Sequence, residues 1–127
     1  MNSKALMINT SSFLGLLGVM LLFLPSEISH FFGFGTDYEI VLQLMSGIYL
    51  GFAMLNWMSK ESILGGIYGR PIVLGNFFHF FVGTISLIKF SFKNSDEIAF
   101  VVLGAVYSIL AVLFGIKLFF HPNVKSK

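Results

Sequence analysis

One histidine, in the middle of a long apolar segment, is the residue best suited to chemistry. His79 shares a helical face with Asn76, Gly83 and Ser86, which follow one another at intervals of three or four residues. We expect this face to point toward other helices, because a histidine N–H has no partner in lipid. The simplest role is a neutral imidazole hydrogen-bonded to a neighbour at similar depth, for which the candidates are Ser46, Tyr49, Tyr107 and Ser108.

The functional alternatives for His79 are a haem ligand, a metal ligand and a pH-sensitive gate. A haem with two histidine ligands needs a second histidine inside the membrane, but His30 and His121 lie at or beyond the ends of the apolar segments. One histidine per chain would hold haem only across a dimer, so no cofactor is expected. No carboxylate is placed to orient His79 and no nucleophile–base–acid set is present, so we do not expect an enzyme.

A second group of polar side chains lies at similar depth near one end of the apolar segments. Hydrogen bonds between helices are its simplest explanation, each worth about 0.6 kcal/mol on average. The alternative is a small polar pocket in which Arg70 and Lys60 hold an anionic headgroup or substrate. With the histidine included, the candidate intramembrane polar cluster consists of Asn9, Ser12, Asn56, Arg70, Asn76 and His79.

Four apolar segments supply the elements that must position these residues, and each reaches the roughly 20 residues that a spanning helix needs. The fold class predicted for the single domain, 1–127, is all-α: a four-helix transmembrane bundle that runs up-down-up-down. A short helix after the first span is expected to lie in the membrane interface. No small-x-small pattern follows the first segment, so we expect a retained span and not a cleaved signal peptide. The predicted spans are 5–24, 39–58, 71–90 and 97–120.

The composition requires such an environment. Of the 127 residues, 56% are hydrophobic and 11% are charged, whereas an ordinary soluble domain carries about 25% charged residues. The net charge of +2 is too small for a nucleic-acid surface, and the absence of cysteine excludes disulfides and thiolate metal sites. No aspartate or glutamate lies well inside a predicted span, which argues against a proton-coupled drug carrier.

Small residues recur at helical spacing in three of the predicted spans. Helices in lipid gain little from burying apolar surface, so such residues mark close helix–helix contact. The contact is within the chain or, alternatively, forms a seam between two copies of it. The face in the first span is Ser11, Gly15 and Gly18, the pair in the second is Gly47 and Gly51, and the stripe in the fourth is Gly104, Ser108, Ala111 and Gly115.

The distribution of positive charge predicts the orientation of the spans, because lysine and arginine gather on the cytoplasmic side. With four spans, both termini and the middle connection share one side of the membrane. The other side carries Lys89 and Lys93. We therefore expect both termini in the cytoplasm, the side that carries Lys4, Lys60, Arg70, Lys117, Lys125 and Lys127.

Three short runs give the chain a resemblance to a known group of proteins. They are GFAMLNWMSK at 51–60, RPIVLGN at 70–76, and the stretch from Pro25 to Gly33. In these runs and in its layout of spans, the chain resembles small bacterial inner-membrane proteins described as DoxX-like or uncharacterised. The resemblance implies a four-helix protein of the bacterial inner membrane and carries no established activity.

The function expected from these features is that of a non-enzymatic multi-pass membrane protein that acts through contacts. Its partners would be the lipid bilayer and a membrane protein, either a second copy of the chain or a different protein. The alternative is an oligomeric small-molecule transporter or channel component, with a polar path lined by the His79 face. No nucleic-acid partner is expected.

Overall fold

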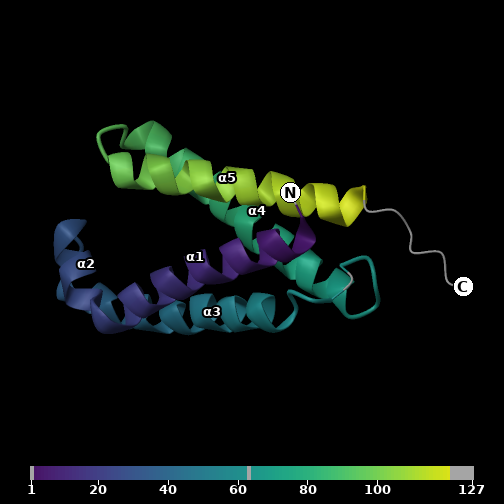
Figure 1. The fold of residues 1–127 in the computed structure, drawn as a ribbon. Helices are drawn as coiled ribbons and strands as arrows, with labels where there is room; N and C mark the ends of the chain where they lie inside the picture. Colours follow the sequence, from purple (N-terminus) through teal and green to yellow (C-terminus); the bar gives the residue numbers. More distant parts are fainter. Residues whose placement is uncertain (1, 63, 121–127) are drawn as a thin grey trace, which may run out of the picture. The chain divides into compact units, whose positions relative to one another are not determined.

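The structure is a computed structural model that describes residues 2–62 and 64–120. This part of the chain forms helices and contains no strand, which confirms the predicted all-α class (Figure 1). In chain order the elements are α1 (Ser3–Phe23), α2 (Pro25–Phe31), the short 3-10 helix η1 (Thr36–Tyr38), α3 (Glu39–Met58), α4 (Gly69–Lys93) and α5 (Ile98–Phe119).

Four helices, α1, α3, α4 and α5, are long and apolar enough to cross a membrane. Even α3, with 20 residues, is about 30 Å long at a rise of about 1.5 Å per residue, which matches the hydrocarbon core of a bilayer. The bounds of α3 are the predicted ones, and those of α1 and α5 differ from prediction by one or two residues. By length and composition, the chain is an integral membrane protein.

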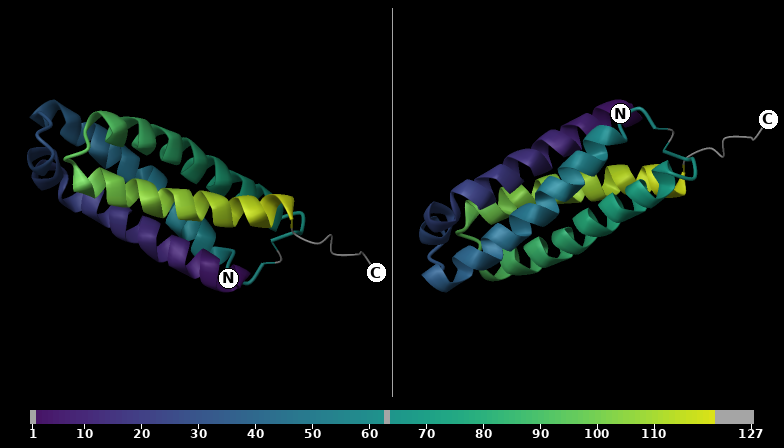
Figure 2. Two further views of the ribbon diagram at one scale, coloured as in Figure 1. Left: turned by 90° about the horizontal axis from the view of Figure 1, so that it is seen from above. Right: turned by 90° about the horizontal axis from the view of Figure 1, so that it is seen from below.

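The chain divides into two compact units, Met1–Glu61 and Ser62–Lys127. Each unit is a pair of long helices, with α1 packed along α3 in the first and α4 packed along α5 in the second (Figure 2). We call these units the first hairpin and the second hairpin. The sequence predicted one domain without this division.

Small residues bring α1 and α3 together in the first hairpin. The Ser11 hydroxyl donates to the Ala53 carbonyl at 2.7 Å, a buried bond between the two helices. A Cβ added at Gly15 would lie 3.7 Å from the Ala53 Cβ, and one at Gly18 would lie 2.7 Å from Leu50 Cγ. The face predicted for the first span is therefore confirmed as a packing face.

The connection between α1 and α3 contains the short helix predicted after the first span. Pro25 begins α2, a position where its missing N–H costs no hydrogen bond. The buried Ser29 hydroxyl lies 2.9 Å from the Gly35 carbonyl and ties the end of α2 to the following turn. That turn contains Gly33 at a φ of +70°, which suits glycine. The position of α2 in the membrane interface stays a prediction.

Aromatic rings fill the contact between α4 and α5 in the second hairpin. Phe80 of α4 and Phe114 of α5 are fully buried, and their rings stack at a centroid distance of 5.9 Å. A Cβ at Gly104 would lie 3.4 Å from Leu87 Cβ, and one at Gly115 would lie 3.2 Å from Phe77 Cε2. These contacts place both glycines of the predicted stripe, Gly104 and Gly115, against α4.

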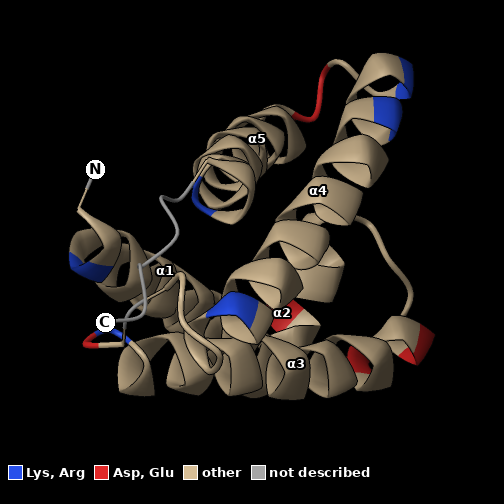
Figure 3. Cartoon of the chain, turned by 90° about the vertical axis from the view of Figure 1, so that its right-hand side faces the viewer, with Lys and Arg blue, Asp and Glu red and all other residues tan. Residues whose placement is uncertain are grey.

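Charged residues lie toward the ends of the long helices and in the connections, and the middles of the helices are apolar (Figure 3). In the first hairpin, Lys4 Nζ lies 2.6 Å from Glu61 Oε1, so an ion pair joins the start of α1 to the residues after α3. Nearby in sequence, Lys60 Nζ lies 3.6 Å from the centre of the Trp57 ring. The carboxylates at the opposite end of this hairpin are Glu27, Asp37 and Glu39.

Candidate functional site

The histidine singled out from the sequence contacts a tyrosine of the facing helix. His79 Nε2 on α4 lies 3.3 Å from Tyr107 Oη on α5. Tyr107 was one of four partners predicted for the imidazole, and the structure selects it within the second hairpin. Ser108, another of the four, donates to the Gly104 carbonyl of its own helix at 2.7 Å. His79 therefore stands in the packing contact between α4 and α5.

The same tyrosine occupies the space beside Gly83. A Cβ added at Gly83 would lie only 2.5 Å from both Cδ1 and Cε1 of the Tyr107 ring. Tyr107 is 3% exposed, and its ring also meets Phe80 edge to face at 5.0 Å. The ring thus packs against His79, Phe80 and Gly83, all within about one turn of α4.

The histidine–tyrosine bond should make a small, measurable contribution to stability. We expect a double-mutant cycle of His79→Leu and Tyr107→Phe to give a coupling energy of about 0.6 kcal/mol, the average for such bonds within membranes. Tyr107→Phe keeps the ring beside Gly83 and removes only the hydroxyl. Unfolding by SDS in mixed micelles, followed by circular dichroism, measures the four variants. Strict additivity of the two substitutions would show that the bond contributes nothing.

Two asparagines of the predicted cluster are fully buried, Asn56 on α3 and Asn76 on α4. Each amide donates to the carbonyl four residues earlier in its own helix, at 2.8 Å to Phe52 and 2.9 Å to Ile72. Asn56 belongs to the first hairpin and Asn76 to the second. These bonds supply a partner inside the helix for a group that is costly to expose to lipid.

Asn9 and Ser12, the members of the predicted cluster on α1, do not lie inside the first hairpin. Asn9 and Ser12 are exposed, whereas the intervening Thr10 and Ser11 are buried. Successive residues of a helix are about 100° apart, so the face that brings Ser11 to Ala53 turns Ser12 outward. The contact between α1 and α3 therefore does not include Asn9 and Ser12, and the polar group predicted from three helices stays a prediction.

The glycine pair predicted to pack the second span makes no such contact within the first hairpin. Gly47 and Gly51 are exposed, and a Cβ added at either meets no described atom within 4 Å. The face that α3 turns to α1 contains Leu50 and Ala53, and the glycines lie beside it around the helix. Gly47 and Gly51 therefore do not pack α3 against α1, and the alternative of a seam with a second copy of the chain stays a prediction.

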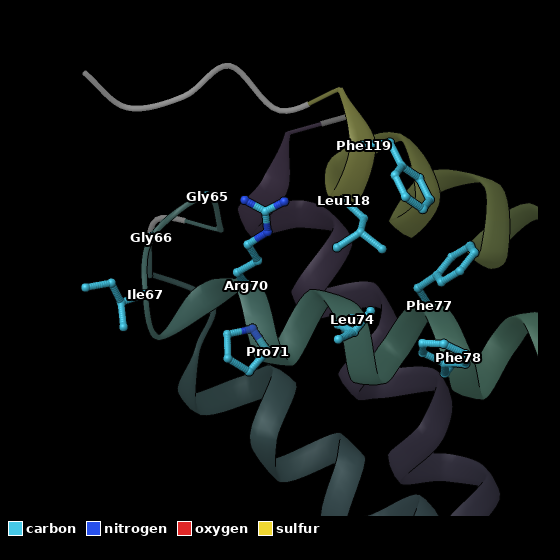
Figure 4. Close-up of a pocket in the computed structure, with 10 residues that line it drawn as sticks. All are labelled: Gly65, Gly66, Ile67, Arg70, Pro71, Leu74, Phe77, Phe78, Leu118 and Phe119. Atoms are coloured by element: carbon cyan, nitrogen blue, oxygen red, sulfur yellow. The ribbon is translucent and has the colours of Figure 1, made fainter. Parts of the chain in front are cut away.

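Arg70 lies in the second hairpin at the edge of a groove that the sequence did not predict. The groove has a volume of about 740 Å³ and lies along the first turns of α4, the end of α5 and the loop before α4 (Figure 4). Lys60, which was predicted to assist Arg70, belongs to the first hairpin, where it lies over Trp57. The residues lining the groove are Gly65, Gly66, Ile67, Arg70, Pro71, Leu74, Phe77, Phe78, Leu118 and Phe119.

The charge of Arg70 has no counterion among residues 2–62 and 64–120. The ion pair found in this part of the chain joins Lys4 to Glu61 instead. Arg70 is also the one charged residue among those that line the groove. A guanidinium carries five N–H donors and no acceptor, so this end of the groove presents donors alone. Its chemistry suits an anion.

A second hollow lies at the other end of the first hairpin, beside α2. It has a volume of about 570 Å³, and its titratable lining residues are Glu27, His30 and Glu39. Within the part of the chain that the structure describes, no group of three histidines or carboxylates is close enough to hold a metal ion. This hollow therefore gives no metal centre.

Comparison with known proteins adds no family to this description. No protein-family model, no curated protein and no solved structure matches the chain. The function is therefore argued from the contacts of the described residues.

Proposed function

We propose that this chain is a non-enzymatic protein of a bacterial inner membrane, and that it acts through contacts with lipid and with a membrane partner. The observation that carries the proposal is how little of each span is interior: between 17% and 33% of the residues in the four most apolar windows are buried. A protein with so small an interior leaves most of its side chains at least partly accessible to its surroundings. Its surface is therefore the part available for a function.

The state of the buried polar groups supports the same proposal. His79 contacts Tyr107, and the amides of Asn56 and Asn76 donate to backbone carbonyls of their own helices. Catalytic groups need a reacting atom within hydrogen-bond reach, and a transport path needs polar groups that face water. The His79 face is instead occupied by the Tyr107 ring beside Gly83, so we do not assign it a path.

We also propose that both termini face the cytoplasm. Lys4 and Lys60 lie at one end of the first hairpin, and Arg70 and Lys117 lie at one end of the second, in the first turn of α4 and the last turn of α5. Lysine and arginine favour the cytoplasmic side. Lys125 and Lys127, which also entered the prediction, lie outside the described residues.

Membrane fractionation and crosslinking test the proposal together. We expect the chain to stay in the membrane pellet after an alkaline carbonate wash, and crosslinking in native membranes to capture a second copy or another membrane protein. A reporter fused after Lys127 should be active in the cytoplasm. Release into the carbonate supernatant would contradict the proposal. Uptake by liposomes that is lost in His79→Ala would favour the transporter alternative instead.

A further inference from the structure

The groove beside Arg70 combines one cation with an apolar floor. Arg70, Leu74, Phe77 and Phe78 follow one another along one side of α4, so the lining changes from cationic to apolar within two turns. From Arg70 to Phe78 the helix rises about 12 Å at about 1.5 Å per residue. One leaflet of the hydrocarbon core is about 15 Å thick, half of the usual 30 Å. The groove, from its cationic end to Phe78, therefore extends along α4 almost as far as one leaflet is deep.

The position of the groove along α4 fits the boundary between headgroups and hydrocarbon. Tyr68 and Ile67, just before α4, are 85% and 88% exposed, and exposed tyrosine is typical of membrane–water interfaces. Figure 4 shows the Arg70 side chain rising from the first turn of α4, close to the loop at Gly65 and to Leu118 at the end of α5. In a bilayer that α4 crosses, the guanidinium would thus lie at the level of the lipid phosphates.

Aromatic rings close the deep end of the groove. Phe77 of α4 and Phe119 of α5 meet edge to face at 5.8 Å, and Phe119 is 69% exposed. Phe78 is 55% exposed and Leu74 is 42% exposed, although both line the hollow. These side chains present apolar surface in a concave arrangement, which suits a flexible hydrocarbon chain better than a polar solute.

We infer that this groove binds one anionic phospholipid, with its phosphate on Arg70 and the upper part of an acyl chain along Leu74, Phe78 and Phe119. The inference rests on the proposed function, because it needs the second hairpin to lie in a bilayer. Charge complementarity selects the occupant: the arginine has no carboxylate partner in the described residues, and a guanidinium pairs with phosphate through two parallel hydrogen bonds. The volume of about 740 Å³ lies within the range of about 300–1,000 Å³ that is typical of ligand sites.

A tryptophan placed in the groove can report its occupant in the intact chain. The sequence contains one tryptophan, so Trp57→Phe gives a silent background into which Phe119→Trp is introduced. The purified protein is reconstituted in phosphatidylcholine vesicles, and phosphatidylglycerol with brominated acyl chains replaces part of the lipid. Quenching of the tryptophan then measures the relative affinity for the two lipids. Ile116→Trp is the matched control, because residue 116 is exposed on α5 within one turn of Phe119 but does not line the groove.

At position 119 we expect phosphatidylglycerol to bind about fivefold more strongly than phosphatidylcholine, the effect of about one favourable arginine contact at an anionic lipid. This preference should disappear in Arg70→Gln and persist in Lys93→Gln, which removes a charge from the other end of α4. Equal quenching by the two lipids, or the same preference at position 116, would overturn the inference. Relief of quenching by excess inorganic phosphate would also overturn it, since it would indicate a general anion site.

A carbonate wash of the same vesicles separates the two ways in which the experiment can fail. If the variants stay in the pellet but show no lipid preference, the lipid site is wrong and the proposed membrane protein stands. If they are released from the vesicles, the proposed function itself fails. A second copy of the chain or a partner helix in the groove would block quenching by both lipids at position 119, which would contradict the inference.

Discussion

Replacing Gly83 by alanine is expected to destabilise the protein by about 1 to 3 kcal/mol, the usual cost of adding a methyl group to a well-packed site. The added Cβ would lie 2.5 Å from two ring atoms of Tyr107. That ring cannot turn aside cheaply, because it is 3% exposed and touches both His79 and Phe80. Alanine gains about 0.5 to 1 kcal/mol over glycine in helix propensity, which is too little to offset the clash. Unfolding by SDS in mixed micelles measures the difference.

Gly104→Ala is the matched control for this substitution. It adds a methyl group to the same helix pair from the α5 side, where the new Cβ would lie 3.4 Å from Leu87 Cβ, at the short limit of ordinary van der Waals contact. We expect its stability to stay within about 1 kcal/mol of the parent, because the higher helix propensity of alanine offsets this closer contact. Combining Gly83→Ala with Tyr107→Leu should cost less than the sum of the two single changes, because the obstructing ring is gone. A Gly83→Ala protein as stable as the parent would show that α4 and α5 are not held at this distance.

The spans could be predicted from the sequence because length and apolarity suffice to define a helix in lipid. The second predicted span has the bounds of α3, whereas α4 begins two residues before the predicted span and ends three residues after it. Its extra residues include Arg70 and Lys93, which are good helix formers but too polar for the criterion that placed the boundaries. The thickness of the hydrocarbon core sets the length of the apolar part of a helix. It does not set the length of the whole helix, which can continue into the interface.

The packing faces could be predicted only in part, since a small residue marks a face without naming its partner. The glycines of α5 lie against α4 as expected, but Gly47 and Gly51 do not contact α1. Polar side chains were a weaker guide still. Ser11 and Ser12 are the same residue type at nearly the same depth. Ser11 is buried because it lies on the side of α1 that faces Ala53, and Ser12 is exposed because it lies on another side.

The site features that the sequence did not predict depend on which residues of two neighbouring helices lie at the same level. His79 and Gly83 were placed on one face by their spacing, and Tyr107 was one of four candidate partners. To predict that the Tyr107 ring contacts both residues, one must know the register of α4 against α5. No local pattern in the sequence contains that register. The groove was missed for a different reason: phenylalanine occurs 16 times in the chain, so the ones that line a hollow resemble those that face lipid.

The second large effect is expected at Gly18, where α1 approaches α3 most closely among the glycines of the first hairpin. A Cβ there would lie 2.7 Å from Leu50 Cγ and 3.1 Å from the Leu50 backbone nitrogen. A rotation of the leucine side chain cannot relieve a contact with backbone, so Gly18→Ala must push the two helices apart. We expect a loss of about 1 to 3 kcal/mol, measured by SDS titration with Trp57 fluorescence as the probe of this hairpin.

Gly15→Ala separates this local clash from a general intolerance of the α1–α3 contact. Gly15 lies on the same face one turn earlier, and its added Cβ would lie 3.7 Å from Ala53 Cβ, which is ordinary contact. The helix propensity of alanine should then make Gly15→Ala neutral or up to about 1 kcal/mol more stable than the parent. The two substitutions are identical and lie three residues apart, so residue type cannot explain changes in stability of opposite sign. The close approach of α1 to Leu50 would explain them. Equal losses at both positions would contradict the register of α1 on α3, and with it the assignment of Ser11, rather than Ser12, to the buried face.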